Sequence, residues 1–338
     1  MLSIIRDKSQ WDALYATLHR PSIVASHGYV NAAAQLENSG RAELAVWSGD
    51  DRIVFHPYIR RQIDGESELD DLVSAWEFGG FWFDTDHQDH QVELLQTFSK
   101  AFFQRCADEK IVSEVVRLYP FAPFVATSIN PYHIRYYSEH IIIPLTEPYE
   151  TLWQAFPSSL RGKIRQAERH RLSARPSEDI NTFARVYHQN LDRLGAEPFY
   201  YFPAAFLQAI QAHIQLLFVF DHRDRVCAAH CYLEDGGVYF AFLCHGVQEA
   251  LDLRPNDFAY NAAVQEAQKR RFRFLHMGGG GPSLMAYKRK FSRMTRPFYI
   301  GRCIFRPDIY AALVAQRQQR LGIDLTKSSH FPVYRTLA

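Results

Sequence analysis

Short apolar runs alternate with amphipathic segments along the whole chain. In residues 9–19 the apolar side chains recur at helical spacing, and they would share one face. The same spacing predicts helices over about 28–36, 90–107, 149–156, 160–170, 180–194 and 256–269, and shorter ones from 203 and over 283–291. Strand-sized runs predict strands over about 2–6, 42–48, 52–59, 111–119, 140–145, 214–221, 225–234, 238–246, 273–278 and 298–305.

The order of these elements is similar in the two halves of the chain. Each half has antiparallel strands, followed by a helix and a further strand. Mixed order of this kind is typical of α+β layers. We therefore expect two copies of one fold, residues 1–145 and 146–304, with a seam near residue 145.

Composition agrees with two compact domains and limits the kinds of partner. The chain has 338 residues, 47% of them hydrophobic, which is enough for two cores at roughly 150 residues per domain. Lys and Arg total 38 against 37 Asp and Glu, so a contact with phosphate must come from a local basic patch. Five scattered cysteines do not indicate a disulfide framework, and the apolar runs are too short to span a membrane. Because the first residues lack a long apolar stretch, we expect no signal peptide. We expect a soluble, cytoplasmic, monomeric protein.

A basic segment at 158–175 is the first candidate for binding chemistry. Arg161, Arg165 and Arg169 are four residues apart, so on a helix they form one stripe. Guanidinium groups bind phosphate oxygens through paired, charge-assisted hydrogen bonds. A solvated helix face explains the same pattern.

A glycine-rich segment at 277–291 is the second candidate. Four consecutive glycines, among them Gly279 and Gly280, lie between a predicted strand and a helix, where backbone N–H groups can approach a ligand. The segment lacks the GKS/T ending of a P-loop and is not GxGxxG. A tight turn explains the glycines equally well, and Lys288 beside Tyr287 could be a surface lysine whose stem covers apolar area.

The aromatic run at 199–202, which includes Tyr201, could line a ligand cleft or belong to a core. Cys227 and Cys231 lie about 13 Å apart on a predicted strand, so we expect them to pack rather than share a metal. No zinc or hydrolase motif is present, and we expect no metal site.

The ordered series of these segments resembles the FemABX family of non-ribosomal peptidyltransferases. The matching segments are FGGFWF (78–83), VVRLYPF (115–121), LRGKIRQAER (160–169), LDRLGAEPFYYF (191–202), and HMGGGG (276–281) followed by YKRKF (287–291).

That resemblance implies two tandem GNAT-like (acyl-CoA N-acyltransferase-like) domains with an intervening cleft and no long coiled-coil arm. It implies that residues from about 305 to 338 return to the first domain, with a helix over 308–321. It also implies transfer of an aminoacyl group from aminoacyl-tRNA, as co-substrate, to an amine acceptor such as a peptidoglycan-precursor peptide.

The resemblance further implies roles for particular residues. Lys288 would stabilise the negative charge of the reaction, Arg161 would contact phosphate, and Tyr201 would lie on the cleft wall. We also expect Arg165, Tyr287, Gly279 and Gly280 among the substrate-binding residues. An activated ester needs no cofactor or covalent intermediate. The alternative is an N-acyltransferase that uses a CoA thioester on a small-molecule or peptide amine.

Overall fold

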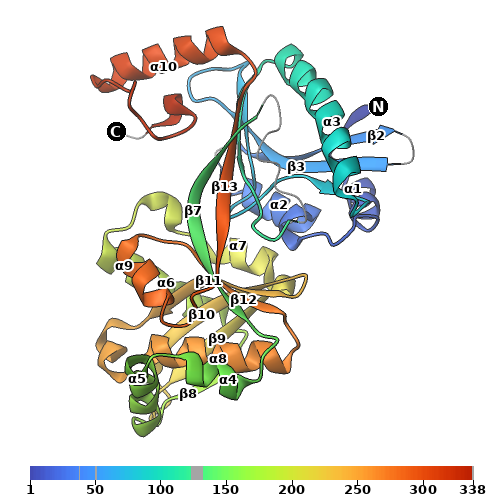
Figure 1. Cartoon of the computed structure of the whole chain (residues 1–338). Helices are drawn as coiled ribbons and strands as arrows, with labels where there is room; N and C mark the ends of the chain where they lie inside the picture. Colours follow the sequence, from blue (N-terminus) through green and yellow to red (C-terminus); the bar gives the residue numbers. More distant parts are fainter. Residues whose placement is uncertain (38, 50–51, 123–131, 337–338) are drawn as a thin grey trace. The chain divides into compact units, whose positions relative to one another are not determined.

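Apolar runs form the strands of this protein and amphipathic segments form its helices, as the computed structural model shows for residues 1–37, 39–49, 52–122 and 132–336 (Figure 1). The chain divides into two compact units, Met1–Tyr137 with Phe298–Ala338, and Ser138–Pro297. The chain passes between the units within β7 (His133–Pro144) and β13 (Thr295–Ile304). The domain boundaries predicted from the sequence lie at about residues 145 and 304.

The first unit is a mixed sheet with helices on both faces. Its strand order is β1-β2-β3-β4-β6-β13, with β4 and β6 parallel and the other neighbours antiparallel. Phe55 on β3 packs against Trp11 of α1, whereas the adjacent Val54 lies in the cluster that includes Phe98 of α3. The elements introduced here are β1 (Leu2–Ile5), α1 (Lys8–Tyr15), α2 (His27–Ala34), β2 (Arg41–Gly49), β3 (Arg52–Gln62), β4 (Asp70–Val73), β5 (Trp82–Phe83), α3 (Gln88–Asp108), β6 (Ile111–Arg117) and α10 (Pro307–Leu321).

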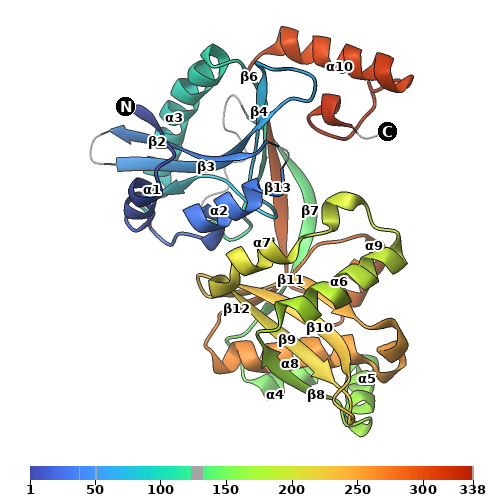
Figure 2. The same cartoon turned by 180° about the vertical axis from the view of Figure 1, so that it is seen from behind.

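The second unit repeats this arrangement. Its strand order is β7-β12-β11-β10-β9-β8, with β12 and β11 parallel and the other neighbours antiparallel. Figures 1 and 2 show α4, α5 and α8 at one face of this sheet and α6 and α7 at the other. Its elements are α4 (Tyr149–Ala155), α5 (Ser158–Arg169), β8 (Ser173–Ser177), α6 (Ile180–Leu194), α7 (Ala204–Ala209), β9 (Ile214–Phe220), β10 (Val226–Asp235), β11 (Val238–Gly246), α8 (Pro255–Lys269), β12 (Phe274–Gly278) and α9 (Pro282–Lys288).

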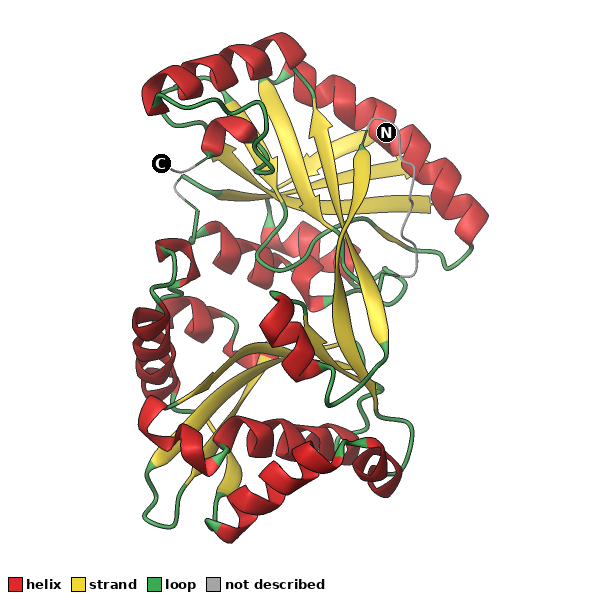
Figure 3. Ribbon diagram, turned by 60° about the vertical axis from the view of Figure 1, so that its left-hand side comes forward, coloured by secondary structure: helices red, strands yellow, loops and turns green. Residues whose placement is uncertain are grey.

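Within each unit the strands therefore follow the same order of orientations: three antiparallel pairs, a parallel pair and a final antiparallel pair. This confirms the expected α+β class and the two similar halves, and Figure 3 shows strands and helices mixed in both. The expected cleft between the domains stays a prediction. Among the described residues, no helix combines the length and apolarity needed to cross a bilayer.

Some elements differ from the sequence prediction. The helix expected over 9–19 ends at Tyr15, and the one expected to reach 291 ends at Lys288 and continues as a turn. The prediction missed β8, whose sequence SARPS contains Pro176 and no apolar alternation. Because β8 pairs only at the edge of the sheet order, a proline is tolerated there. Cys227 and Cys231 are buried, as expected.

Candidate functional site

In the second unit the pairing of β11 with β12 ends part of the way along β11, and we call this the point where the two strands separate. Their parallel ladder has three residue pairs and ends at Phe240 and His276. Beyond it, β11 runs on to Gly246, whereas β12 stops at Gly278 and the chain turns toward α9. The residues of this glycine turn (Gly278–Gly281) lie at the end of the parallel ladder.

Lys288 extends from the last position of α9 back to the glycine turn. Its ammonium Nζ donates a hydrogen bond of 2.6 Å to the carbonyl oxygen of Gly279, and the residue is only 7% exposed. The surface-lysine alternative is therefore wrong, because a lysine whose charge reaches bulk water would be exposed. A buried ammonium held by a backbone carbonyl has a fixed direction.

Positive φ angles at Gly278 and Gly280 and a close contact at Gly279 favour glycine at these three positions of the turn. Gly278 has φ of +72°, and a Cβ there would lie 3.6 Å from Nζ of Lys288 and 3.7 Å from the Phe240 ring. A Cβ on Gly279 would lie 2.8 Å from Cδ2 of His140, closer than real contacts allow. Gly280 has φ of +144°, which other residues rarely adopt.

Two buried histidines lie beside this turn. Nδ1 of His140 on β7 is 2.9 Å from Nε2 of His276 on β12, and the Phe240 ring stacks on His276 with centroids 4.6 Å apart. Burial and the charge of Lys288 lower the pKa of His140 to about 4, and burial lowers the pKa of His276 well below its usual value. Both imidazoles are therefore neutral at pH 7, next to the Lys288 ammonium.

Sequence reasoning missed this pair. Each histidine lies in an apolar strand, and the two are 136 residues apart, so no local spacing connects them. Only the pairing of β7 with β12 brings them together.

Tyr287 is partly buried and packs against the core cluster that includes Tyr260 of α8. Its ring lies 5.7 Å from Phe291 and 6.2 Å from Tyr260. Burial, with a contribution from Asp257, raises the pKa of the Tyr287 hydroxyl well above its ordinary value. Tyr287 is thus a neutral core phenol in this structure.

Arg161 and Arg165 lie on α5 and contact α4. Nη1 of Arg161 donates to the carbonyl oxygens of Gln154 and Phe156, at 2.9 and 2.6 Å. The Arg165 guanidinium lies over the Trp153 ring at 5.7 Å. Arg161 therefore caps the C-terminal end of α4, and the phosphate contact expected of both arginines stays a prediction.

Tyr201 follows α6 and a short 3-10 turn, Pro198–Tyr200. Its hydroxyl donates to the Asp192 carboxylate at 2.8 Å, and the residue is half-buried. The neighbouring Phe202 is a core residue, stacked on Phe242 with centroids 6.0 Å apart. The aromatic run therefore contributes to the core at Phe202, and the role of Tyr201 at a cleft wall stays a prediction.

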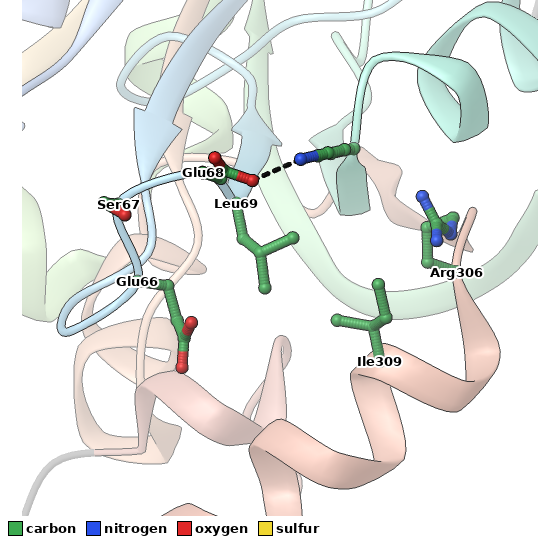
Figure 4. Close-up of a pocket in the computed structure, with 7 residues that line it drawn as sticks. Glu66, Ser67, Glu68, Leu69, Arg306 and Ile309 are labelled. Carbon is green, nitrogen blue, oxygen red and sulfur yellow. Dashed lines mark hydrogen bonds and ion pairs between the residues drawn. The ribbon is translucent and has the colours of Figure 1, made fainter.

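A cavity of about 380 Å³ lies in the first unit, beside the start of α10 (Figure 4). Its polar lining is largely paired: Glu68 binds Lys110, and Arg306 donates to the carbonyl oxygen of Ala107. It contains none of the residues expected to act on substrate. Among the described residues, no three His, Cys, Asp or Glu side chains gather as a metal ion would require.

Comparison with known proteins agrees with this geometry. A family model described as an acetyltransferase (GNAT) domain matches residues 155–289, which include α5, the separated strands and Lys288. Among curated proteins, no sequence matches the chain.

Solved structures resemble the chain over most of its length, at identities that establish the fold alone. FemX superimposes with a TM-score of 0.69 at 11% identity, over 92% of this chain and 99% of FemX. L-PGS from Bacillus licheniformis has a TM-score of 0.53 at 12% identity, over 88% of this chain and 92% of that one. A tandem GNAT protein from the clavulanic acid biosynthesis pathway has a TM-score of 0.52 at 8% identity, over 90% and 99%.

The chain is therefore a tandem GNAT-like protein with the fold of FemX. The Fem resemblance of its sequence segments is supported by this fold. The GNAT domain model over residues 155–289 supports a transferase of acyl groups.

Proposed function

We propose that this protein is an aminoacyltransferase that forms an amide bond, moving an aminoacyl group from aminoacyl-tRNA to an amine acceptor such as a peptidoglycan-precursor peptide. The observation on which the proposal depends is the buried Lys288 ammonium, directed by the Gly279 carbonyl at the point where β11 and β12 separate. The Fem-like order of the sequence segments supports the donor.

The chemistry requires few groups. The acceptor nitrogen attacks the ester carbonyl carbon, the carbonyl oxygen becomes an anion, and the bond to the tRNA ribose oxygen then breaks. The proton lost by the amine passes to that leaving oxygen. Holding the two reactants in place can contribute about 7–11 kcal/mol, and one preorganised donor to the oxyanion about 3–4 kcal/mol. Lys288 supplies this donor.

The neutral histidine pair favours a single charged group at the site. Because the imidazoles of His140 and His276 are uncharged at pH 7, they do not compete with Lys288 for the developing anion. They also offer the acceptor an environment in which a neutral amine, the reactive form, is favoured over an ammonium.

The proposed role of Lys288 is tested directly by the rate of aminoacyl transfer in the variant Lys288→Met. Purified protein is incubated with radiolabelled aminoacyl-tRNA and a cell extract, and the labelled product is identified. Lys288→Met should lower the rate at least a hundredfold, as expected for the loss of about 3 kcal/mol of transition-state stabilisation. Lys290→Met, two residues away, is the matched control and should retain activity. An unchanged rate in Lys288→Met would exclude the assigned role.

An acyl-CoA-dependent N-acyltransferase is the second candidate, favoured by the acetyltransferase description of the model that matches residues 155–289. The two donors are separated by measuring thermal stabilisation with CoA and gel retardation of charged tRNA. Saturable stabilisation by CoA without retardation of tRNA would replace the first proposal with the second.

A further inference from the structure

An amide–imidazole pair joins α6 to β11, on the opposite face of the sheet from α8. Nδ2 of Asn190 lies 2.8 Å from Nδ1 of His245, and Oδ1 of the same amide accepts a 2.9 Å hydrogen bond from Arg193. A guanidinium can only donate, so the amide atom that Arg193 contacts is the oxygen. The amide nitrogen of Asn190 must then face His245.

This arrangement fixes the tautomer of His245. The amide nitrogen of Asn190 can only donate, so Nδ1 of His245 is the acceptor and the ring proton lies on Nε2. Burial, followed by repulsion from His230, lowers the pKa of His245 to about 3. At pH 7 the imidazole is therefore neutral, with one N–H donor at Nε2.

That donor has no acceptor in the part of the chain that the structure describes. Nε2 of His245 is buried and makes no hydrogen bond. The Tyr187 ring lies 4.9 Å from the imidazole, and Ala229, the residue opposite on β10, offers only a methyl group. Buried polar groups without partners are rare in proteins, and such a group calls for an acceptor supplied from outside the chain.

We propose that Nε2–H of His245 binds an uncharged oxygen, a carbonyl or a hydroxyl, of the acyl or aminoacyl donor substrate. The proposal rests on the proposed transferase function. A neutral N–H donor beside the Tyr187 ring suits an uncharged oxygen, because an anion there would lose its hydration without gaining a counter-charge. Both possible donors have such oxygens at a distance from the reacting carbonyl: the ribose hydroxyls of the nucleotides that precede the terminal one in tRNA, and the amide carbonyls of the CoA pantetheine arm.

The position of His245 makes it a positioning residue rather than a catalytic one. It lies on β11 five residues beyond Phe240, about 16 Å along an extended strand. Phe240 and Nζ of Lys288 both border the Cβ position of Gly278. His245 therefore meets a part of the donor distant from the reacting carbonyl, and its loss should affect binding more than the chemical step.

Nitrogen-15 NMR of the histidine rings in the wild-type protein tests the tautomer. The spectrum should show His245 protonated at Nε2 and bare at Nδ1. A proton on Nδ1 alone would overturn the proposal.

Binding is measured by calorimetry with two probes, CoA and a CCA-ended RNA minihelix. His245→Phe keeps a ring but removes the N–H donor. Its affinity for the probe that the wild type binds should be at least tenfold lower. His245→Gln, which retains an N–H donor, should recover part of that loss. Equal affinity in the wild type and His245→Phe overturns the proposal, as does binding of neither probe to the wild type. The probe whose affinity falls in His245→Phe, CoA or RNA, identifies the class of donor substrate.

If His245→Phe does not fold, Asn190→Leu provides the test, since it removes the amide that fixes the tautomer. It should raise KM for the donor at least fivefold and leave kcat nearly unchanged, and an unchanged KM overturns the proposal. Lys288→Met separates the two hypotheses: full transfer by that variant removes the role of Lys288, whereas unchanged binding by His245→Phe removes only that of His245.

Discussion

The ammonium of Lys288 and the carbonyl oxygen of Gly279 lie 2.6 Å apart, joined across the turn between β12 and α9. The same glycine has His140 on its other side, where a Cβ would lie 2.8 Å from the imidazole. Gly279 therefore lies between the Lys288 ammonium, which its carbonyl orients, and the neutral His140 ring, which leaves no room for a side chain at this position. The direction of the lysine depends on the conformation of one peptide group.

Gly279→Ala should disturb that direction. The new methyl group overlaps His140, and overpacking of this kind typically lowers the free energy of unfolding by about 1–3 kcal/mol. We expect a fall in transfer rate of tenfold or more, with a lower melting temperature. The rate is measured with the labelled aminoacyl-tRNA assay and the stability by thermal unfolding.

Two further variants make this prediction specific. Gly281→Ala lies in the same turn with no atom within 4 Å of its new Cβ, so its rate and stability should remain near those of the wild type. Adding His140→Ala to Gly279→Ala should recover part of the lost activity, because the overlap is removed. If the double variant is no more active than Gly279→Ala, the contact with His140 is not the cause.

Acid should destabilise the second unit. In the unfolded chain His140 titrates near 6.5, whereas in the folded protein its pKa is about 4. Above pH 6.5 both states are neutral and stability does not depend on this group. Between pH 6.5 and 4 the unfolded state binds a proton that the folded state does not, so the free energy of unfolding falls, by a few kcal/mol in total.

Thermal unfolding measured from pH 7.5 to 4 checks this prediction. His140→Asn should flatten the pH dependence of the melting temperature, because the variant has lost a titrating group. His222→Asn, at an exposed histidine of the β9–β10 turn, should follow the wild-type curve. Identical slopes for wild type and His140→Asn would mean that His140 is not neutral in the fold.

Sequence patterns predicted most of the fold because its elements have strong periodicity. The helix expected over 256–269 differs from α8 by one residue, and each strand of the parallel pair β11 and β12 was expected within one residue of its bounds. Residues 173–177 were missed because an edge strand needs no apolar alternation. The α1 prediction was too long because apolar spacing continues to Leu18 after the helix has ended.

The candidate site was predicted less completely. Lys288 was predicted as a site residue from the order of the Fem-like segments, whereas the local pattern favoured a surface lysine. His140 and His276 lie in different strands, and their contact depends on sheet pairing that one sequence does not reveal. The orientation of Asn190, and with it the tautomer of His245, depends on a third residue, Arg193.

Tyr201 provides a test of the expected cleft wall. Tyr201→Phe removes the hydrogen bond to Asp192 but keeps the ring, and an exposed bond of this kind contributes about 0.5–1.5 kcal/mol. We expect transfer within twofold of the wild type for Tyr201→Phe and a KM raised severalfold for Tyr201→Ala. Equal KM values for the two variants would show that the ring does not contact substrate.

Arg161→Ala separates a structural role from phosphate binding. Loss of the hydrogen bonds to Gln154 and Phe156 should lower the stability of the protein by about 1–3 kcal/mol, because it exposes the end of α4. If Arg161 also contacts tRNA phosphate, the salt dependence of tRNA binding should decrease by about one counterion. Arg169→Ala, at an exposed position of the same helix, is the control for general charge. A stability loss with an unchanged salt slope would leave Arg161 as a helix cap alone.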